Sequence, residues 1–369
     1  MSDRTEGGTS HTSKTILNWA DGYRETLDRI IALRGTPVTI LATGDPLHFG
    51  IGSTLGREFP ADEMRILPSP SAFSLAAARL GWPLQSVACI TLHGRPVEHL
   101  NRHLFPGARV LALTSDGSTI VQAADMLVAR GFGASVLHVL EHMGGARERT
   151  VRMTAQDLLA ANTPFADFNT LAIDCAGDGP VLPLVPGLPD DAFRHDGQLT
   201  KREIRAATLA LLAPYPGALL WDVGAGCGSI AIEWMRAGGR AIAVEAKPER
   251  LAMIAENAGA LGVPDLKITE GMAPAALDAL EAADAVFIGG GLTGEGVFEA
   301  AWAGVKPGGR LVANAVTLEG EARLVELRGR HGGELTRISV ARAAPVGRYC
   351  GWKSLMPVTL WLVHKERDA

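Results

Sequence analysis

The sequence predicts an α/β protein made of two domains, the second of which is a doubly wound, largely parallel sheet. The chain has 369 residues, a length typical of two domains rather than one. Hydrophobic residues make up 47% of the chain and charged residues 20%, the balance of a globular protein with buried cores. Glycine is abundant, with 43 residues, while aromatic residues make up only 5%. This favours many tight strand-to-helix turns over an aromatic-rich binding module.

Charge, cysteine usage and the N-terminal segment narrow the function classes. The formal net charge of −5 gives no long-range attraction for nucleic acid, so we expect no such partner. The four cysteines lack the paired spacing of a zinc site, and we predict no metal and a reduced, cytoplasmic setting. Residues 1–14 are polar, without the apolar run of a signal peptide, and we expect a disordered tail there. Since no apolar run reaches the roughly 20 residues that span a bilayer, we expect no membrane partner.

Strands alternate with helices through the first half. Apolar residues recur at helical spacing from Ile16 to Leu33, which predicts a helix. Further helices are predicted over Ser71–Leu80 and Ile120–Arg130. This alternation predicts a largely parallel sheet with crossover connections. The predicted strands are Val38–Ala42, Glu63–Leu67, Val87–Leu92, Arg109–Leu113, Ser135–Leu140 and Thr170–Asp174.

A segment rich in proline and glycine separates this half from the next. Residues 177–189 carry four prolines and three glycines, so they can continue neither a helix nor a central strand. We therefore predict a linker at 177–189 between domains at 15–176 and 190–369.

The second half is predicted to form one complete doubly wound domain. Helices are predicted over Lys201–Leu212, Ile230–Ala237 and Pro248–Leu261, and another ends at Lys306 before a turn at Pro307-Gly-Gly309. The predicted strands are Ala218–Val223, Arg240–Val244, Lys267–Thr269, Ala285–Ile288, Arg310–Ala313, Thr336–Arg342 and Pro357–Val363, the last two forming a closing hairpin.

The sharpest motif is Trp221-Asp-Val-Gly-Ala-Gly-Cys-Gly-Ser229, where a buried strand passes into a helix. Gly224, Gly226 and Gly228 let the backbone turn tightly and approach a ligand without a Cβ in the way. The context and the residue types therefore predict a cofactor loop.

Two acidic residues decide which cofactor this loop suits. Dinucleotide sites follow Gly-x-Gly-x-x-Gly and seat a pyrophosphate on a helix N-terminus, whereas the spacing here is Asp-x-Gly-x-Gly-x-Gly. The carboxylate of Asp222 would repel a pyrophosphate but suits an ammonium group. Glu245 ends the next strand, about 20 residues on, where a carboxylate can accept hydrogen bonds from both ribose hydroxyls. We predict S-adenosylmethionine (SAM), a cation without phosphates; a nicotinamide cofactor and a purely structural turn remain the alternatives.

Two further segments end strands at the same edge of the sheet. Glu270-Gly-Met-Ala-Pro274 could contact adenine, although an ordinary strand-to-helix loop has the same pattern. The glycines that end Asp284–Gly291 leave open space for a substrate, which makes Gly289 and Gly290 candidate substrate-binding residues. Methyl transfer needs alignment and a dry pocket more than acid or base groups, so no catalytic residue is predicted.

These motifs, with Gly197-Gln-Leu-Thr-Lys-Arg-Glu-Ile-Arg205, resemble the decarboxylating C15-methyltransferase domain of cobalamin biosynthesis across nearly all of residues 190–369. The resemblance implies a Rossmann-like class I SAM-methyltransferase fold. Thr200 has a second interpretation as the N-cap of the following helix. The predicted cofactor-binding residues of this half are Thr200, Asp222, Gly224, Ala225, Gly226, Cys227, Gly228, Glu245, Gly271, Met272 and Ala273.

Two turns in the first half also follow predicted strands. In Gly44-Asp-Pro-Leu-His-Phe-Gly50, Asp45-Pro46 fixes a tight turn, and Gly50 and Gly52 allow close approach of the backbone. In Pro68-Ser-Pro-Ser-Ala-Phe-Ser74, the serines can cap a helix or offer hydroxyls to a ligand. Each turn alone fits plain turn chemistry as well as a site.

Together these turns resemble the tetrapyrrole (corrin/porphyrin) methylase family, in which such segments flank a SAM cleft. Leu92–Pro96, Glu141–Thr150 and Ala172–Cys175 extend the resemblance. Members of this family begin with a strand and a glycine-rich loop, whereas this chain passes from a polar segment to a helix. We therefore expect the first strand of the N-terminal sheet to be missing. The implied cofactor-binding residues are Gly44, Asp45, Pro46, Ser71 and Ala72.

The order of the two domains resembles the fused C5,15-methyltransferases of cobalamin biosynthesis. It implies methylation of a precorrin at C5 and C15 with loss of the ring-C acetate carboxyl, from precorrin-6B to precorrin-8, and assembly into a homo-oligomer. Two alternatives remain. Either only the C-terminal domain is active, on a precorrin, another small molecule, RNA or protein, or the chain is a SAM-binding sensor.

The implied substrate is a polyanion with an apolar ring, which calls for cationic side chains and backbone N–H donors. The candidate residues are His93, Arg95, Arg147 and Arg149, of which the two last flank a loop beside Gly144-Gly145. Such residues are more often solvated surface charges.

Overall fold

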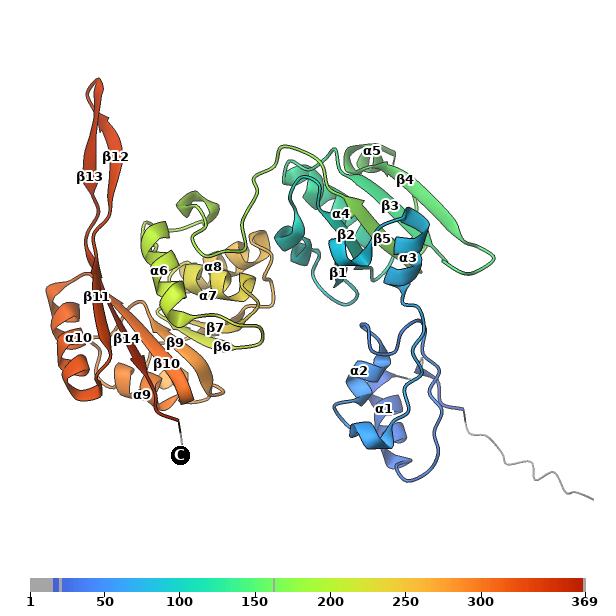
Figure 1. Ribbon diagram of the computed structural model, residues 1–369, viewed down its shortest axis with the longest axis horizontal. Helices are drawn as coiled ribbons and strands as arrows, with labels where there is room; N and C mark the ends of the chain where they lie inside the picture. The colour runs from blue at the N-terminus through green and yellow to red at the C-terminus, as the bar shows by residue number, and fades with distance from the viewer. Residues whose placement is uncertain (1–15, 20–21, 162, 368–369) are drawn as a thin grey trace, which may run out of the picture. The chain divides into compact units, whose positions relative to one another are not determined.

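The computed structural model describes residues 16–19, 22–161 and 163–367, which separate into two compact units, Met1–Leu75 and Ala76–Ala369 (Figure 1). In the first unit, the helices α1 (Tyr23–Ala32) and α2 (Ile51–Leu55) enclose a small apolar cluster centred on Leu27, Ile30 and Leu55. A short 3-10 helix, η2 (Ala61–Glu63), follows, and α3 (Ala72–Leu80) begins at the end of this unit.

The first unit corrects three predictions. The helix expected from Ile16 begins only at Tyr23, after Gly22 with a left-handed φ of 122°. The strands predicted at Val38–Ala42 and Glu63–Leu67 are wrong, since residues 16–19 and 22–75 contain no strand. A strand needs a neighbour for its backbone N–H and C=O groups, and neither segment has one, so apolar residues such as Leu41 stay exposed (87%).

The second unit begins with a five-stranded sheet in the order β1-β2-β5-β3-β4. Only β1 and β2 run parallel, whereas the other three pairings are antiparallel. The prediction of a largely parallel sheet in this half is therefore wrong. The physical reason is the segment 142–148, which is a short turn that joins β3 and β4 as a hairpin instead of a crossover. The strands are β1 (Ala88–Thr91), β2 (Arg109–Leu113), β3 (Val136–Glu141), β4 (Arg149–Thr154) and β5 (Asn169–Asp174), packed against α4 (Ser118–Ala129) and α5 (Ala155–Ala161), with η3 (Leu84–Ser86) and η4 (Val97–His103) in the connections.

The second sheet has seven strands in the order β11-β14-β10-β9-β6-β7-β8. The strands from β10 to β8 in this order are parallel, and β14 pairs antiparallel with both β10 and β11. The chain order reverses at β6, which confirms the doubly wound sheet. The strands are β6 (Leu219–Val223), β7 (Arg240–Glu245), β8 (Lys267–Glu270), β9 (Ala283–Ile288), β10 (Val305–Ala315), β11 (Glu334–Ile338) and β14 (Val358–His364).

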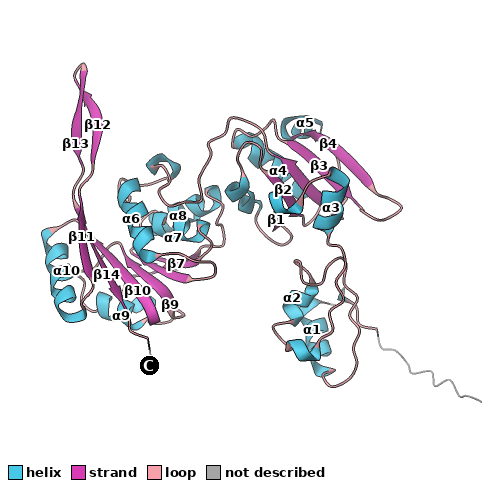
Figure 2. Cartoon of the chain, in the orientation of Figure 1, coloured by secondary structure: helices cyan, strands magenta, loops and turns pink. Residues whose placement is uncertain are grey.

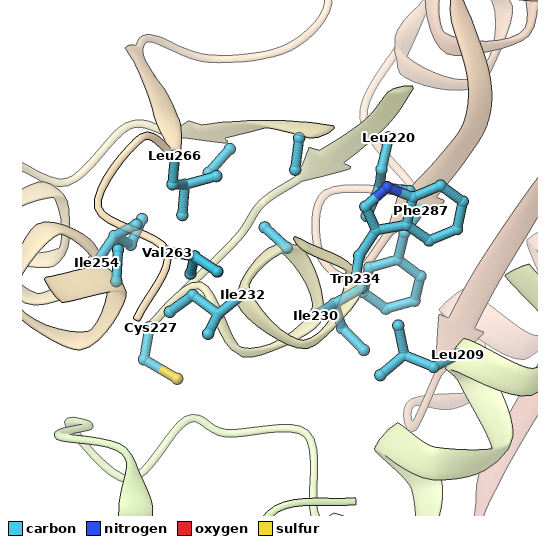
Figure 3. Close-up of a cluster of buried hydrophobic side chains, with 14 of the residues drawn as sticks. Leu209, Leu220, Cys227, Ile230, Ile232, Trp234, Ile254, Val263, Leu266 and Phe287 are labelled. Carbon is cyan, nitrogen blue, oxygen red and sulfur yellow. The ribbon is translucent and has the colours of Figure 1, made fainter. Parts of the chain in front are cut away.

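Helices cover both faces of this sheet (Figures 1 and 2). Alternate strand residues Leu220, Phe287 and Val312 belong to the apolar cluster on the side of α6, α7 and α8 (Figure 3). Their neighbours in sequence, such as Trp221 and Val286, belong to the cluster on the side of α9 and α10. Burial on both faces explains why the central strands are continuous apolar runs. The helices are α6 (Arg202–Leu212), α7 (Ser229–Arg236), α8 (Pro248–Ala260), η6 (Ala275–Leu277), α9 (Val297–Ala303) and α10 (Leu318–His331).

At the edge of the seven-stranded sheet formed by β11 and β14, the chain between the two strands differs from the prediction. β11 and β14 pair as expected, but β12 (Ala341–Val346) and β13 (Tyr349–Ser354) form a separate hairpin between them, which projects from the sheet in Figure 1. β10 also runs through the predicted turn at Pro307-Gly-Gly309, with a shift of register between Val305 and Arg310.

The segment predicted as a linker, 177–189, contains neither helix nor strand and is held by a buried ion pair. Arg205 is fully buried, and its Nε donates to Glu233 at 2.5 Å. Glu233 in turn accepts the backbone N–H groups of Gly187 at 2.6 Å and Leu188 at 3.0 Å. One charge pair thus fixes the end of this segment to α6 and α7.

No helix within the described ranges has the length and apolar character needed to cross a membrane.

Replacing Arg205 with methionine should strongly destabilise the seven-stranded domain. The substitution leaves the Glu233 carboxylate buried without its cation, and breaking a buried pair in this way costs about 3–5 kcal/mol. We expect the free energy of unfolding in urea, followed by tryptophan fluorescence, to fall by that amount. The control is Arg240→Met, which breaks the exposed pair between Arg240 and Glu281 and should cost less than about 1 kcal/mol. Equal losses in the two variants would contradict the role given to Arg205.

Candidate active site

A cleft of about 1070 Å³ opens at the C-terminal ends of the central strands of the seven-stranded sheet. The loops that follow β6, β7, β8 and β9 all contribute to its lining. Backbone hydrogen bonds join these loops to neighbouring strand ends: Gly224 N–H donates to Val244, Gly271 N–H to Glu245, and Gly289 N–H to Val223. Parallel strands end at one edge of a sheet, so residues far apart in the sequence, from Gly197 to Val358, meet around one cavity.

The glycine-rich loop adopts the conformation that its sequence predicts. Gly224, Gly226 and Gly228 all have left-handed φ values, of 71°, 61° and 79°. A Cβ on Gly224 would lie 3.1 Å from the backbone nitrogen and oxygen of Gly290. Gly228 does not line the cleft, and a Cβ there would lie 3.0 Å from Ile254. Gly224 therefore lets the loops after β6 and β9 approach closely, whereas Gly228 allows α7 to pack against α8.

Asp222 is a buried carboxylate with one unpaired oxygen at the cleft. Its Oδ2 accepts the backbone N–H of Ala231 at 3.0 Å, while Oδ1 has no partner among the described residues. Burial raises the pKa of Asp222 to about 7; the Ala231 N–H lowers it, and the negative charge of Glu245 raises it further. A buried unpaired acceptor is costly, so this site suits a ligand with a cationic or N–H donor.

Glu245 ends β7 with both carboxylate oxygens engaged. Its Oε2 accepts the Gly226 N–H at 2.9 Å, and Oε1 accepts the N–H groups of Ala246 and Lys247 at 3.0 and 3.1 Å. Each carboxylate oxygen can accept two hydrogen bonds, so Oε2 retains capacity for a ligand hydroxyl. The predicted adenine segment, Gly271–Ala273, lies at the neighbouring strand end and lines the same cleft.

The segment before α6 forms another wall of the cleft. Arg250 holds it by donating to Asp196 Oδ2 at 2.7 and 2.9 Å and to Gln198 Oε1 at 2.8 Å. Thr200 lines the cleft as predicted, but its interpretation as an N-cap is wrong: the N-cap is Lys201, without a side-chain bond. The carbonyl of Thr200 instead accepts a hydrogen bond from Arg205 at 2.5 Å.

The remaining wall was missed by motif analysis. Gly289 and Gly290 line the cleft as predicted. Opposite the cofactor loop, however, the lining comes from α6, the end of β10, β14 and the chain on either side of the β12–β13 hairpin. No short motif marks these positions, because they are brought together only by the sheet. The residues are Ile204, Asn314, Val316, Val340, Leu355, Met356 and Val358.

The predicted cofactor residues of the first unit form a compact turn. Asp45 Oδ1 accepts the N–H groups of Leu47 and His48 at 2.8 and 3.2 Å, which confirms the tight turn. A Cβ on Gly44 would lie 3.6 Å from Ser71 Cα, and Ser71 Oγ accepts the Ser74 N–H at 3.2 Å as a cap of α3. The structure therefore brings Gly44–Pro46 and Ser71–Ala72 together.

The four predicted cationic candidates do not line the cleft described above. Arg149 forms a bidentate pair with the buried Glu141, at 2.6 and 3.0 Å, which neutralises its charge and lowers the pKa of Glu141. His93 Nδ1 lies 3.2 Å from the carbonyl oxygen of Thr114. Arg95 lines a smaller hollow of about 450 Å³ beside Glu98 and Asp125, and Arg147 is exposed in the β3–β4 turn.

The donor set of the cleft fits SAM and not a dinucleotide. Two buried carboxylates, Asp222 and Glu245, line the cleft and would repel the negative charges of a pyrophosphate bound there. The unpaired Oδ1 of Asp222 matches an ammonium group, and the glycine loop leaves room that a Cβ would fill. Since the cleft is lined by groups that bind and orient rather than by an acid–base pair, it suits group transfer by alignment.

Comparison with known proteins identifies both halves. The family description "Precorrin methyltransferase domain" matches residues 191–365, and "Tetrapyrrole (Corrin/Porphyrin) Methylases" matches residues 7–159. The chain is 52% identical over 349 residues to a precorrin-6Y C(5,15)-methyltransferase [decarboxylating] of Sinorhizobium sp, covering 93% of this chain and 84% of the relative.

Two further relatives each match about half of the chain. A probable cobalt-precorrin-6B C(15)-methyltransferase (decarboxylating) of Pyrobaculum calidifontis is 39% identical over 182 residues, 47% of this chain and 93% of the relative. The crystal structure of the C-terminal domain of precorrin-6Y C5,15-methyltransferase from Rhodobacter capsulatus is 48% identical, with a TM-score of 0.48, covering 50% of this chain and 100% of that one. The full-length relative extends over both halves, and the chain therefore belongs to the precorrin-6Y C5,15-methyltransferase (decarboxylating) family.

Proposed function

We propose that this chain uses SAM to methylate a precorrin at C5 and C15 and releases the ring-C acetate carboxyl as CO₂, converting precorrin-6B to precorrin-8. The observation that carries the proposal is the match to a fused relative over 93% of the chain, joined to a cleft whose buried carboxylates suit a cationic cofactor. We further propose that residues 15–176 and 190–369 are the two methylating domains, joined by 177–189, and that the protein acts in the cytoplasm as a homo-oligomer.

In the second domain, the cleft binds and orients. SAM, when bound, supplies an electrophilic methyl group. Asp222 would pair with its ammonium group, Glu245 with the ribose hydroxyls, and the backbone of Gly271–Ala273 would lie against adenine. Gly290, where a Cβ would meet nothing within 4 Å, leaves the approach to the reacting carbon open, while the missing side chain of Gly289 makes room for the ring of Phe287. Decarboxylation needs no protein nucleophile, because the electron pair left by CO₂ can pass into the conjugated macrocycle; a proton then adds to the former acetate carbon, which becomes a methyl group.

In the first domain, the proposed second cofactor site uses Gly44–Pro46 and Ser71–Ala72. Support comes from their proximity across two turns and from the match of residues 7–159 to the tetrapyrrole methylases. Each domain would thus carry its own cofactor.

The direct test is incubation of the full chain with precorrin-6B and SAM, followed by mass analysis. Two methyl groups gained and one CO₂ lost is the expected result. A single methyl gained with CO₂ lost would mean that only the C-terminal domain is active, which is the second candidate function. An unchanged mass would overturn the proposal.

Cofactor affinity should rise with pH through about 7. The ammonium group favours ionised Asp222, whereas the free protein holds this carboxyl protonated below its pKa of about 7. Binding on the acid side must therefore release a proton, and affinity falls with the ionised fraction. We expect roughly tenfold tighter binding at about pH 7.5 than at about pH 6 by calorimetry. Asp222→Asn should bind more weakly without this slope, and an unchanged slope in that variant would count against Asp222.

Two glycine variants should separate the two methylations. Gly224→Ala places a Cβ 3.1 Å from Gly290 on a left-handed backbone, so we expect C15 methylation and decarboxylation to be lost while C5 methylation persists. Gly50→Ala places a Cβ 2.5 Å from the Asp45 carbonyl oxygen and should do the reverse. Gly329→Ala is the matched control, since a Cβ there meets nothing within 4 Å. Loss of both methylations in either test variant would contradict independent sites.

A further inference from the structure

The amide side chain of Asn314, which lines the cleft, has a hydrogen-bond partner for its nitrogen but none for its oxygen. Asn314 lies one residue before the end of β10, and its Nδ2 donates to Thr208 Oγ1 on α6 at 2.9 Å. Its Oδ1 is buried but has no hydrogen-bond partner in the described chain. Thr208 is itself fully buried. Buried carbonyl oxygens are normally paired, so the free oxygen of Asn314 needs a physical explanation.

The sheet register places Asn314 beside the transfer site. Ile288 of β9 pairs with Val223 of β6 on one side and with Ala313 of β10 on the other. The next residue on each strand is therefore at the same level, which sets Asn314 level with Gly289 and Gly224. Its contact with α6 puts it on the sheet face where Asp222 meets α7. Gly290 and Asn314 thus line the same cleft, at the level where the central strands end.

The wall around Asn314 is otherwise apolar. It is built by Ile204, Val316, Val340 and Val358, together with the residues 355 and 356 that follow the β12–β13 hairpin. In an apolar pocket, a single polar group decides the orientation of the ligand. The amide is fixed in direction because its other end is tied to Thr208.

We propose that Asn314 is a substrate-binding residue of the C-terminal domain, and that its Oδ1 accepts a hydrogen bond from a ring N–H of the tetrapyrrole. This inference rests on the proposed function. The free atom is an acceptor, so its partner must carry a donor; a carboxylate side chain of the substrate carries none. Thr208 is then a positioning residue, which acts by fixing the direction of the amide through Nδ2.

The test compares Asn314→Leu, which keeps the size of the side chain without its acceptor, with the wild-type chain. We expect kcat/KM for C15 methylation of precorrin-6B to fall by about 10- to 100-fold, while the Kd for SAM stays within about twofold. Thr208→Val should act in the same direction and Thr208→Ser should restore activity, since only the hydroxyl holds the amide. A change in SAM affinity equal to the loss in kcat/KM, or no loss at all, would overturn the proposal.

Two further variants guard against a merely structural effect. Thr359 lies on β14, the strand next to β10, and its hydroxyl donates to Glu321 at 2.8 Å. Thr359→Val removes this hydrogen bond and should leave kcat/KM unchanged. Asn314→Asp keeps an acceptor and should retain more activity than Asn314→Leu; the reverse order would show that a substrate carboxylate lies there and would overturn the N–H assignment. A wild-type chain that binds SAM but makes no product would refute the proposed function instead.

Discussion

The buried pair between Arg205 and Glu233 is the interaction on which the shape of the cleft depends. The chain from 187 to 200 has only one short 3-10 helix, so the ladders of regular structure cannot fix it. Glu233 holds its beginning through two backbone N–H groups, and Arg205 holds its end through the carbonyl of Thr200. Because Thr200 lines the cleft, a charge pair in the core determines where a wall of the site stands.

At the ends of the central strands, the strand register, and not a side-chain contact, positions the loops that line the cleft. Val223 and Ile288 pair with each other and end their strands, so the loops after them leave the sheet at one level, beside Ala313 of β10. Two such loops approach closely at Gly224 and Gly290: a Cβ on Gly224 would lie 3.1 Å from the backbone of Gly290, whereas a Cβ on Gly290 would meet nothing within 4 Å. The glycines are therefore a consequence of sheet geometry and of the space that a cofactor needs.

The accuracy of the sequence-based predictions follows the range of the interactions involved. Strands such as β2 and β6 and the loop after β6 are encoded locally, by apolar runs and glycines, and were predicted nearly to the residue. The segments at 38–42 and 63–67 have strand composition but no pairing partner, which composition does not reveal. β12 and β13 pair with each other between the two strands of the predicted closing hairpin, and composition does not reveal that pairing either. The apolar wall near Val340 and Met356 exists only because the ends of that hairpin return to the sheet beside β10, a long-range effect without a local motif.

The charges of the cleft explain how one cavity can serve a cationic cofactor and an anionic substrate. Its lining holds two buried carboxylates, while its cations are Lys201 and Arg250, and Arg250 is already engaged with Asp196. The part of the cleft beside Asp222 and Glu245 is negative, so it favours the sulfonium form of SAM over the neutral sulfide that is left after methyl transfer. This difference assists release of the spent cofactor. The carboxylates of the substrate would be repelled by this negative part of the cleft, so they should stay outside it. The macrocycle should therefore lay an apolar ring face against the apolar wall, with one neutral amide as its polar anchor there.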